Sequence, residues 1–341
     1  MTLAELGWSN FFAQQVQDSE SELQPARVCR QDINQYHLIT EDKKLTAKLP
    51  GKLWHSAQSK SDLPTVGDWV LTSAIPGGEP STVRIERLLK RKSKFSRQIA
   101  SDKFDEQVVA ANIDTVFVVS GLDDEFNPAR IERYLTLSMN SGVATVILLN
   151  KADISLDHTA KLNELQPIAK NTPSHLISAK KQMGLDAIRQ YIGVSDTCAF
   201  IGSSGVGKST IINSLVGHDH FKTAAVRASD SRGRHTTTFR ELVAVPGHGL
   251  VIDTPGMREL QIWTDPKSGQ SNFEDITEIA SQCKFSDCKH DSEPNCAIRK
   301  AISEGRIDDE RLQRYKKLNL ELDLLKAHQE NIGSARKNHK N

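Results

Sequence analysis

The chain has 341 residues, 38% of them hydrophobic and 26% charged, with a formal net charge of +1. This length predicts about two or three domains, and the near-zero charge excludes a uniformly basic chain, so any nucleic-acid surface must be a local patch. The opening MTLAELGWSNFF lacks the regions of a secretory signal and no stretch reaches the roughly 18 apolar residues of a membrane span, so we expect a cytoplasmic protein without membrane contact.

The first hundred residues predict a leader followed by short strands. Residues 1–25 are polar and weakly patterned, and we expect them to be flexible. From residue 26 to about 100, runs such as YHLIT, KLTAKLP and DWVLTS are separated by turn signals such as LPG and PGG. Several short strands at close spacing predict a small β-barrel or sandwich.

A basic run, KRKSKFSR, closes this region at residues 90–97. It is either a solvated linker or a surface that contacts nucleic-acid phosphates and offers one aromatic ring for stacking. Small barrels flanked by basic residues are typical of the oligonucleotide-binding fold (OB-fold). The candidate RNA-binding residues are Lys90, Arg91, Lys92, Lys94, Phe95 and Arg97.

Strands and helices alternate from about residue 105 to 265. Apolar, β-branched runs at 114–120, 144–150, 174–179 and 197–202 predict buried parallel strands, with helices between them. This alternation predicts a doubly wound α/β sheet that binds ligands at the carboxyl ends of its strands. Residues 266–341 predict a helical region around a Cys/His cluster, ending in a polar tail that we expect to be disordered when free.

The segment GSSGVGKS at residues 202–209 matches the phosphate-loop pattern G-x-x-x-x-G-K-[ST], after an apolar strand and before an amphipathic helix. Backbone N–H groups of such a loop point at phosphate oxygens beside a helix N-terminus. Lys208 is expected to reach the β- and γ-phosphates, and the Ser209 hydroxyl to ligate Mg²⁺. The expected nucleotide contacts are Gly202, Ser203, Ser204, Gly205, Val206, Gly207, Lys208, Ser209 and Thr210.

Two further strand ends predict a preference for guanine. NKAD at residues 150–153 supplies Asp153, whose carboxylate can accept from guanine N1–H and the N2 amine together, whereas adenine has no donor there. Leaving such a buried group unpaired costs about 1–3 kcal/mol, so the polar mismatch discriminates. SAK at residues 178–180 offers the Ala179 N–H to guanine O6. The guanine-side residues are Asn150, Lys151, Ala152, Asp153, Ser178, Ala179 and Lys180.

The segments DTPG at residues 253–256 and GRHTTT at residues 233–238 are expected to be the switches that sense the γ-phosphate. Asp253 would hold Mg²⁺ through water, and the Gly256 N–H would meet the γ-phosphate. One threonine of the second segment should ligate Mg²⁺ in the triphosphate state. The candidates are Thr236, Thr237 and Thr238, of which we favour Thr237.

The position after the D-x-x-G glycine often carries a Gln that orients the attacking water in GTPases. This chain has Met257 there, and a thioether cannot orient a nucleophilic water. Either His235 is catalytic in its place or a partner completes the site. We therefore expect slow intrinsic hydrolysis that a partner accelerates.

Four residues near the C-terminus predict a structural zinc site. They form the pattern C-x₄-C-x-H-x₅-C, which supplies three thiolates and one imidazole, a closed tetrahedral set. Such density in a chain with an odd number of cysteines argues against disulfides. Metal binding would supply folding free energy on the order of 10 kcal/mol. The expected ligands are Cys283, Cys288, His290 and Cys296.

The order of the motifs is itself informative. The guanine motifs precede the phosphate loop, which is the standard GTPase set rotated along the chain. With NKAD, SAK, GSSGVGKST, GRHTTT, DTPG and CKFSDCKHDSEPNC in this order, the sequence from about residue 26 resembles the bacterial ribosome small-subunit-dependent GTPase A family. The resemblance implies an OB-fold domain at 26–100, a circularly permuted GTPase domain at 105–265 and a zinc-binding helical domain at 266–341.

The resemblance also implies a function and partners. It implies a GTPase that uses Mg²⁺ with GTP, binds the 30S ribosomal subunit and its 16S rRNA, and assists late maturation of that subunit, which stimulates hydrolysis. We expect a monomer. An alternative is a GTP-dependent regulator that switches a protein partner through its barrel and zinc domains. A metabolic nucleotide-dependent enzyme lacks support, because beyond the nucleotide motifs no second substrate constellation is visible.

Overall fold

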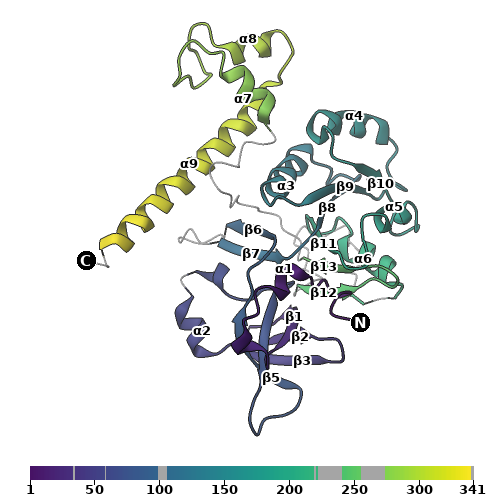
Figure 1. Cartoon of the computed structure of the whole chain (residues 1–341). Coiled ribbons are helices and arrows are strands. Elements are labelled where there is room, and N and C mark those ends of the chain that lie inside the picture. Colours follow the sequence, from purple (N-terminus) through teal and green to yellow (C-terminus); the bar gives the residue numbers. More distant parts are fainter. Residues whose placement is uncertain are drawn as a thin grey trace.

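The computed structural model describes residues 1–33, 35–57, 59–98, 106–218, 220–221, 240–254 and 273–338. Figure 1 shows a barrel, a sheet with its covering helices, and a C-terminal helical region that contains the long helix α9. Among the described residues, no helix combines the length and apolarity that crossing a membrane requires.

The first large element is a closed barrel of five strands: β1 (Gln24–Gln31), β2 (Tyr36–Ile39), β3 (Lys44–Lys48), β4 (Trp69–Ala74) and β5 (Thr82–Leu88). The strands lie in the order β1-β2-β3-β5-β4, and β4 pairs back with β1, so the barrel closes. Alternate side chains, such as Ala26, Val28, Leu45 and Ala47, fill its interior. The helices α2 (Gly51–Ser56) and η2 (Lys60–Asp62) lie between β3 and β4. The expected OB-type barrel is confirmed.

The N-terminal segment differs from the flexible leader expected for residues 1–25. It contains the short helices α1 (Asn10–Ala13) and η1 (Asp18–Glu20), and the side chains of Leu6 and Phe12 are buried. The rings of Trp8 and Trp69 meet edge to face with centroids 4.8 Å apart. The expectation was wrong because a few widely spaced apolar side chains order this segment by packing on Trp69, which a periodicity analysis does not detect.

The central sheet carries the predicted α/β alternation. Its strands are β8 (Thr115–Gly121), β9 (Ala144–Asn150), β10 (Ser174–Leu176), β11 (Thr197–Gly202), β12 (Glu241–Ala244) and β13 (Leu250–Asp253). They lie in the order β10-β9-β8-β11-β13-β12, all parallel except β12, which also pairs with β1 and joins the sheet to the barrel. All seven residues of β8 are buried, as expected of a parallel strand covered on both faces.

Helices and one hairpin complete this part of the chain. The helices are α3 (Pro128–Asn140), α4 (His158–Ala169), α5 (Leu185–Arg189) and α6 (Lys208–Val216). The hairpin of β6 (Lys94–Gln98) and β7 (Glu106–Ala111) links the barrel to the sheet. The strands β9, β11 and β13 each end at a predicted motif, so their carboxyl ends bring NKAD, the phosphate loop and Asp253 to one edge of the sheet.

The C-terminal region consists of α7 (Glu274–Ala280), α8 (Ala297–Ser303) and α9 (Asp309–Asn338). Helix α9 continues through residues 333–338, where we expected a disordered tail. The expectation treated the polar tail as an isolated segment, whereas extending an existing helix is far easier than starting a new one.

Candidate nucleotide site and candidate metal centre

The phosphate loop lies between the buried end of β11 and the start of α6. Gly207 caps α6 with a φ of 98°, and a Cβ atom there would lie 2.2 Å from Asn150 Nδ2. Only glycine therefore fits this position, for both its left-handed backbone and its close contact. At the other end, Gly217 terminates α6 in the left-handed conformation, as the sequence predicted.

Lys208 is buried in the centre of the loop. Its Nζ donates to the backbone carbonyls of Gly202, at 3.0 Å, and Ser203, at 2.8 Å. Burial lowers the pKa of Lys208 to about 8, and the nearby charge of Asp253 opposes that shift. An ammonium group held by carbonyls in this setting is a strong candidate for phosphate binding, because a phosphate would replace dipoles with full negative charges.

Ser209 and Asp253 bring two oxygen atoms together beneath the loop. The Ser209 hydroxyl donates to Asp253 Oδ2 at 2.9 Å, and Asp253 is fully buried at the end of β13. Hydroxyl and carboxylate oxygens are the ligands that Mg²⁺ accepts, with water completing its shell. The other loop residues lie around them: Val206 is buried, Ser204 and Thr210 are partly exposed, and Gly205 is exposed.

Asn150 joins the three predicted nucleotide motifs. Its Nδ2 donates to the Val206 carbonyl of the phosphate loop at 2.8 Å, and its Oδ1 accepts from the Ala179 N–H at 3.1 Å. The side chain is buried, with 3% of its surface exposed. The Ala179 N–H, which we expected to meet guanine O6, is therefore directed at Asn150 in this structure.

Asp153 is exposed beside the SAK loop, where its Oδ1 accepts from the Ser178 hydroxyl at 2.6 Å. This hydrogen bond lowers the pKa of Asp153, so the carboxylate stays ionised. The neighbouring Lys151 has a φ of 68°, and its Nζ lies 2.5 Å from Asp123 Oδ2. Ala152 is buried and Lys180 is exposed.

Two contacts at this edge were not predicted from the sequence. Asp123 follows β8 and pairs with Lys151, and Arg130 of α3 donates to the Ser203 hydroxyl. An acidic residue after a parallel strand is a signal that could have indicated Asp123. Arg130 carries no such signal, because its partner is 73 residues away in the sequence.

The switch residues lie outside the described residues, apart from Asp253 and Thr254. These are His235, Thr236, Thr237, Thr238, Gly256 and Met257. Their predicted roles stay predictions.

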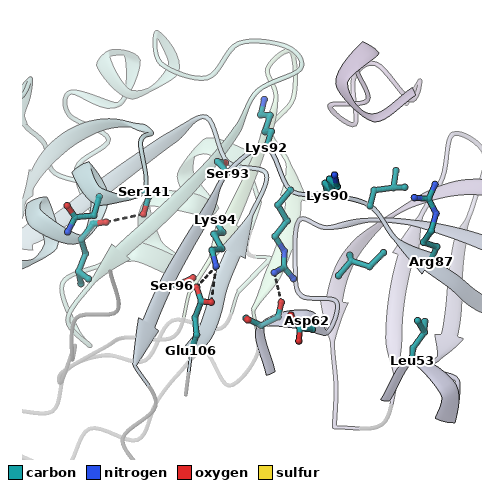
Figure 2. A pocket seen from close by; sticks show the side chains of 16 residues that line it. Leu53, Asp62, Arg87, Lys90, Lys92, Ser93, Lys94, Ser96, Glu106 and Ser141 are labelled. Carbon is teal, nitrogen blue, oxygen red and sulfur yellow. Dashed lines mark hydrogen bonds and ion pairs between the residues drawn. The ribbon is translucent and has the colours of Figure 1, made fainter. Parts of the chain in front are cut away.

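The basic run at residues 90–97 borders a groove of about 830 Å³ between the barrel and α3 (Figure 2). Phe95 is fully buried, so the stacking role predicted for it is wrong. Arg91 is directed inward, where its guanidinium pairs with the fully buried Asp68 at 2.7 Å. The alternation of β6 explains the first finding, because alternate side chains of a strand point to opposite faces and Phe95 lies on the face that packs on the core.

Three lysines of the same run line that groove. Lys92 pairs with Asp114 at 2.6 Å, and Lys94 pairs with Glu106 at 2.6 Å, while Lys90 is exposed. Arg97 donates to the Gln107 side chain at 3.0 Å instead of lining the groove.

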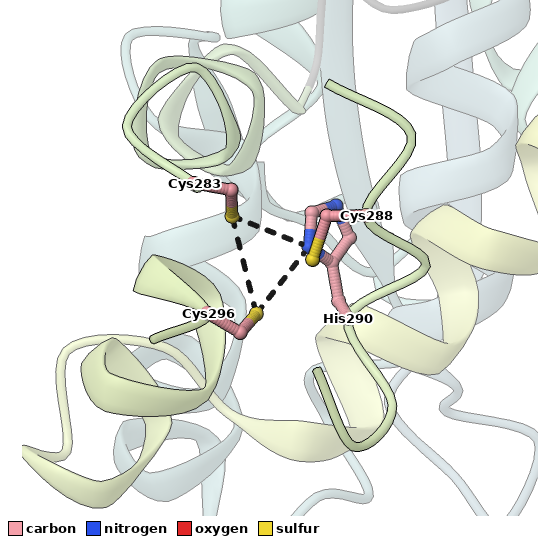
Figure 3. Close-up of side chains that lie close together, drawn as sticks. All are labelled: Cys283, Cys288, His290 and Cys296. Carbon is pink, nitrogen blue, oxygen red and sulfur yellow. Dashed lines mark hydrogen bonds between the residues drawn. The ribbon is translucent and has the colours of Figure 1, made fainter. Parts of the chain in front are cut away.

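The four predicted metal ligands meet in the C-terminal region (Figure 3). The ligand atoms of Cys283, Cys288, His290 and Cys296 all lie within 4.8 Å of one another. Sγ of Cys283 is 3.9 Å from Sγ of Cys296, and His290 Nδ1 lies 3.6 and 3.5 Å from these two sulfurs. A tetrahedral metal with typical zinc bond lengths places two sulfurs roughly 3.8 Å apart and a sulfur and a nitrogen roughly 3.6 Å apart. The cluster therefore has the donor set and the spacing to hold a metal ion.

Comparison with known proteins places this site in a family. The model of the RsgA GTPase family matches residues 88–263. A protein of Opitutus terrae named small ribosomal subunit biogenesis GTPase RsgA is 40% identical over 329 residues, covering 94% of this chain and 90% of that one. A second relative, small ribosomal subunit biogenesis GTPase RsgA 2 of Lactiplantibacillus plantarum, is 42% identical over 296 residues, covering 87% of this chain and 82% of its own.

Solved structures agree with the fold. The crystal structure of YjeQ from Thermotoga maritima superposes with a TM-score of 0.62 at 27% identity, covering 88% of this chain and 98% of that one. The structure of YloQ, described as a circularly permuted GTPase, gives a TM-score of 0.57 at 22% identity, covering 90% of this chain and 97% of that one. The permuted order read from the motifs is thus a property of the fold.

Proposed function

The chain belongs to the RsgA GTPase family, and from this premise we propose that it hydrolyses GTP to GDP and phosphate while assisting the maturation of the small ribosomal subunit. The proposal that the chain binds and hydrolyses GTP is supported by the hydrogen bonds of Asn150, which link the guanine motif to both the SAK loop and the phosphate loop. The proposed role in maturation of the small ribosomal subunit rests on the names of the relatives. We propose a cytoplasmic monomer that binds the 30S subunit through 16S rRNA and is stimulated by it.

The proposed nucleotide contacts divide into two groups. Asp153 would accept from guanine N1–H and the N2 amine, and its position beside Ser178 keeps it ionised for that role. Lys208 would leave the loop carbonyls for the β- and γ-phosphates. Mg²⁺, which neutralises phosphate charge when bound, would be held by Ser209, by Asp253 through water, and by Thr237.

Asp153→Asn tests the guanine assignment. The side-chain amide can donate where xanthine has a carbonyl, so the variant should lose GTP affinity by about 100-fold and gain affinity for XTP. Titration of both nucleotides against the wild-type chain and the variant measures this change. Asp186→Asn, on the exposed side of α5, is the matched control. Equal GTP affinity in Asp153→Asn and the wild type would exclude Asp153 as the base-reading group.

We propose that, of the six residues predicted to bind RNA in the basic run, only Lys90, Lys92 and Lys94 contact rRNA. These side chains line the groove of Figure 2, whereas Phe95 is buried and the Arg91 side chain is only 13% exposed, against 46% for Lys94. Lysines that line an open groove can contact phosphates without a stacking partner, so this surface suits the RNA backbone and not the bases.

GTP turnover with and without isolated 30S subunits tests the ribosomal proposal. We expect stimulation by the subunit, and we expect it to weaken in a variant with Lys90, Lys92 and Lys94 changed to Gln. The difference from the wild type should be largest at low salt and shrink as salt rises, because the variant makes fewer phosphate contacts. The control variant carries the same substitution at the exposed Lys43, Lys300 and Lys317, none of which lines the groove. Absence of stimulation in the wild type would overturn the proposal in favour of a regulator of a protein partner. Full stimulation of the triple variant would exclude this groove.

We also propose that the metal of the Cys/His cluster is a single structural zinc. Three thiolates and one imidazole occupy all four tetrahedral positions, so the site leaves none open for catalysis. The proposed domains remain 26–100, 105–265 for the GTPase domain and 266–341 for the zinc domain. The five barrel strands run from Gln24 to Leu88, so the first domain also takes in β6 of the linking hairpin.

A further inference from the structure

Helix α3 reaches the phosphate loop through Arg130. The guanidinium Nη1 donates to the Ser203 hydroxyl at 2.9 Å. Ser203 is the second residue of the loop and has 3% of its surface exposed, so this contact lies on the buried side of the loop. Arg130 comes from the first turn of α3.

The local sequence fixes the position of Arg130. Asn127 caps α3, with its side chain accepting the Arg130 N–H at 2.9 Å, and Pro128 occupies the first turn. Glu125 lies 3.3 Å from the same guanidinium nitrogen and is more than half exposed. One turn along the helix, the buried Tyr134 also hydrogen bonds to the Ser203 side chain. Two side chains of one rigid helix therefore hold this residue.

Ser203 is also held from the other side. Its carbonyl accepts from Lys208 Nζ at 2.8 Å. When Lys208 turns to the phosphates of a nucleotide, that carbonyl loses its charged donor. The contacts from α3 then become the main restraint on the first half of the loop, whose backbone amides must face the phosphates.

We propose that Arg130 is a positioning residue of the GTPase reaction, which holds Ser203 and thereby the loop amides in register with the phosphates while Lys208 binds nucleotide. This role rests on the proposed nucleotide site. Arg130 acts through Ser203 and does not itself touch the nucleotide.

The same helix offers a matched control. Arg133 is three residues further along α3, and its guanidinium pairs with Glu321 of α9 at 2.6 Å. Removing Arg133 takes the same side chain from the same helix but leaves the contact with the loop in place.

The test measures kcat and KM for GTP, and thermal stability, in Arg130→Ala, Ser203→Ala, the double variant and Arg133→Ala. We expect Arg130→Ala to lower kcat about tenfold, as for loss of a charge-assisted hydrogen bond, while KM changes by less than about threefold. The double variant should be no slower than Ser203→Ala alone, because that change already removes the hydroxyl that Arg130 contacts. Arg130→Lys should recover most of the rate, since its ammonium can still donate to the hydroxyl, and Arg133→Ala should match the wild type.

Three results would overturn the inference. An unchanged kcat in Arg130→Ala would remove the role, and a full further loss from Arg130→Ala in the Ser203→Ala background would show that Arg130 acts by another route. A drop in thermal stability with equal effects on kcat and KM would indicate a merely structural contact. These outcomes differ from failure of the proposed function, in which the wild-type chain itself would not hydrolyse GTP.

Discussion

The nucleotide site and the Cys/His cluster are organised in opposite ways. At the nucleotide site, hydrogen bonds between distant segments hold the key groups in place, as when Asn150 joins Val206 to Ala179. At the cluster, the ligand atoms are gathered within 4.8 Å, but their mutual contacts are weak sulfur contacts of 3.5 to 3.9 Å. The chain therefore prepares the first site before any ligand binds, whereas we expect the second to depend on its metal.

The largest effect should follow from removing a metal ligand. Cys283→Ser breaks a closed four-ligand set whose binding is worth on the order of 10 kcal/mol, so α7 and α8 should lose their fold while the barrel and sheet remain. Circular dichroism and metal analysis of the purified variant measure this loss. Cys29→Ser, in β1 and far from the cluster, should keep both the helix content and the metal. A fully folded Cys283→Ser chain without metal would contradict the expectation that this region needs its metal to fold.

Removing Lys208 should weaken nucleotide binding much more than folding, whereas removing a metal ligand should disrupt folding. Lys208→Ala deletes a buried amine that binds phosphate, so nucleotide affinity should fall about 100-fold or more. The melting temperature without nucleotide should fall only slightly, because the hydrogen bonds lost from the Gly202 and Ser203 carbonyls are offset by removal of an amine whose charged form is disfavoured by burial. Calorimetric titration with GDP and a thermal melt measure the two effects, with the exposed Lys300→Ala as control. A large loss of stability without nucleotide would show that the loop depends on this charge for folding.

Asn150→Ala should lower both stability and nucleotide affinity, because this side chain links the loops that form the nucleotide site. Its loss leaves the Val206 carbonyl and the Ala179 N–H without their partners, which costs about 1–3 kcal/mol of unfolding free energy. GDP affinity should fall with it, since the two loops lose their link. Chemical denaturation without nucleotide measures the first effect, and the exposed Asn163→Ala on α4 is the control. Unchanged stability would mean that the loops are held by other contacts.

The two sites should also respond oppositely to pH. The pKa of Lys208 is about 8 in the folded chain, below the value of about 10.4 in an unfolded one. The unfolded state therefore binds more protons between these values, so this group's contribution to stability rises with pH across that window. GDP binding needs the charged amine, so GDP affinity should fall above pH 8.

Metal affinity should instead rise over the same range, because thiols must lose protons to bind. Titrations of GDP and of zinc at pH 7 to 9.5 compare the two slopes. In Lys208→Arg the charge persists at every pH tested, so the slope for GDP should vanish. A wild-type GDP affinity that is constant above pH 8 would exclude Lys208 as the titrating group.

The sequence predicted the parts of the molecule whose signals are contiguous. The phosphate loop was identified from nine adjacent residues between a strand and a helix, and the same holds for NKAD after β9. Arg130 was missed because its contact with Ser203 exists only once α3 packs against the loop. Phe95 was misassigned because a basic run with one aromatic reads the same whether the ring faces solvent or the core. Spatial pairing, and not residue type, decides such cases.

The most direct test of the contrast is amide hydrogen exchange on the wild-type chain, with and without a zinc chelator and with and without GDP. Chelation should abolish protection in residues 273–309 while GDP still protects residues 150–153 and 202–216, because the nucleotide site is held by its own hydrogen bonds. Loss of GDP protection on chelation, or full protection of residues 273–309 without metal, would contradict the account.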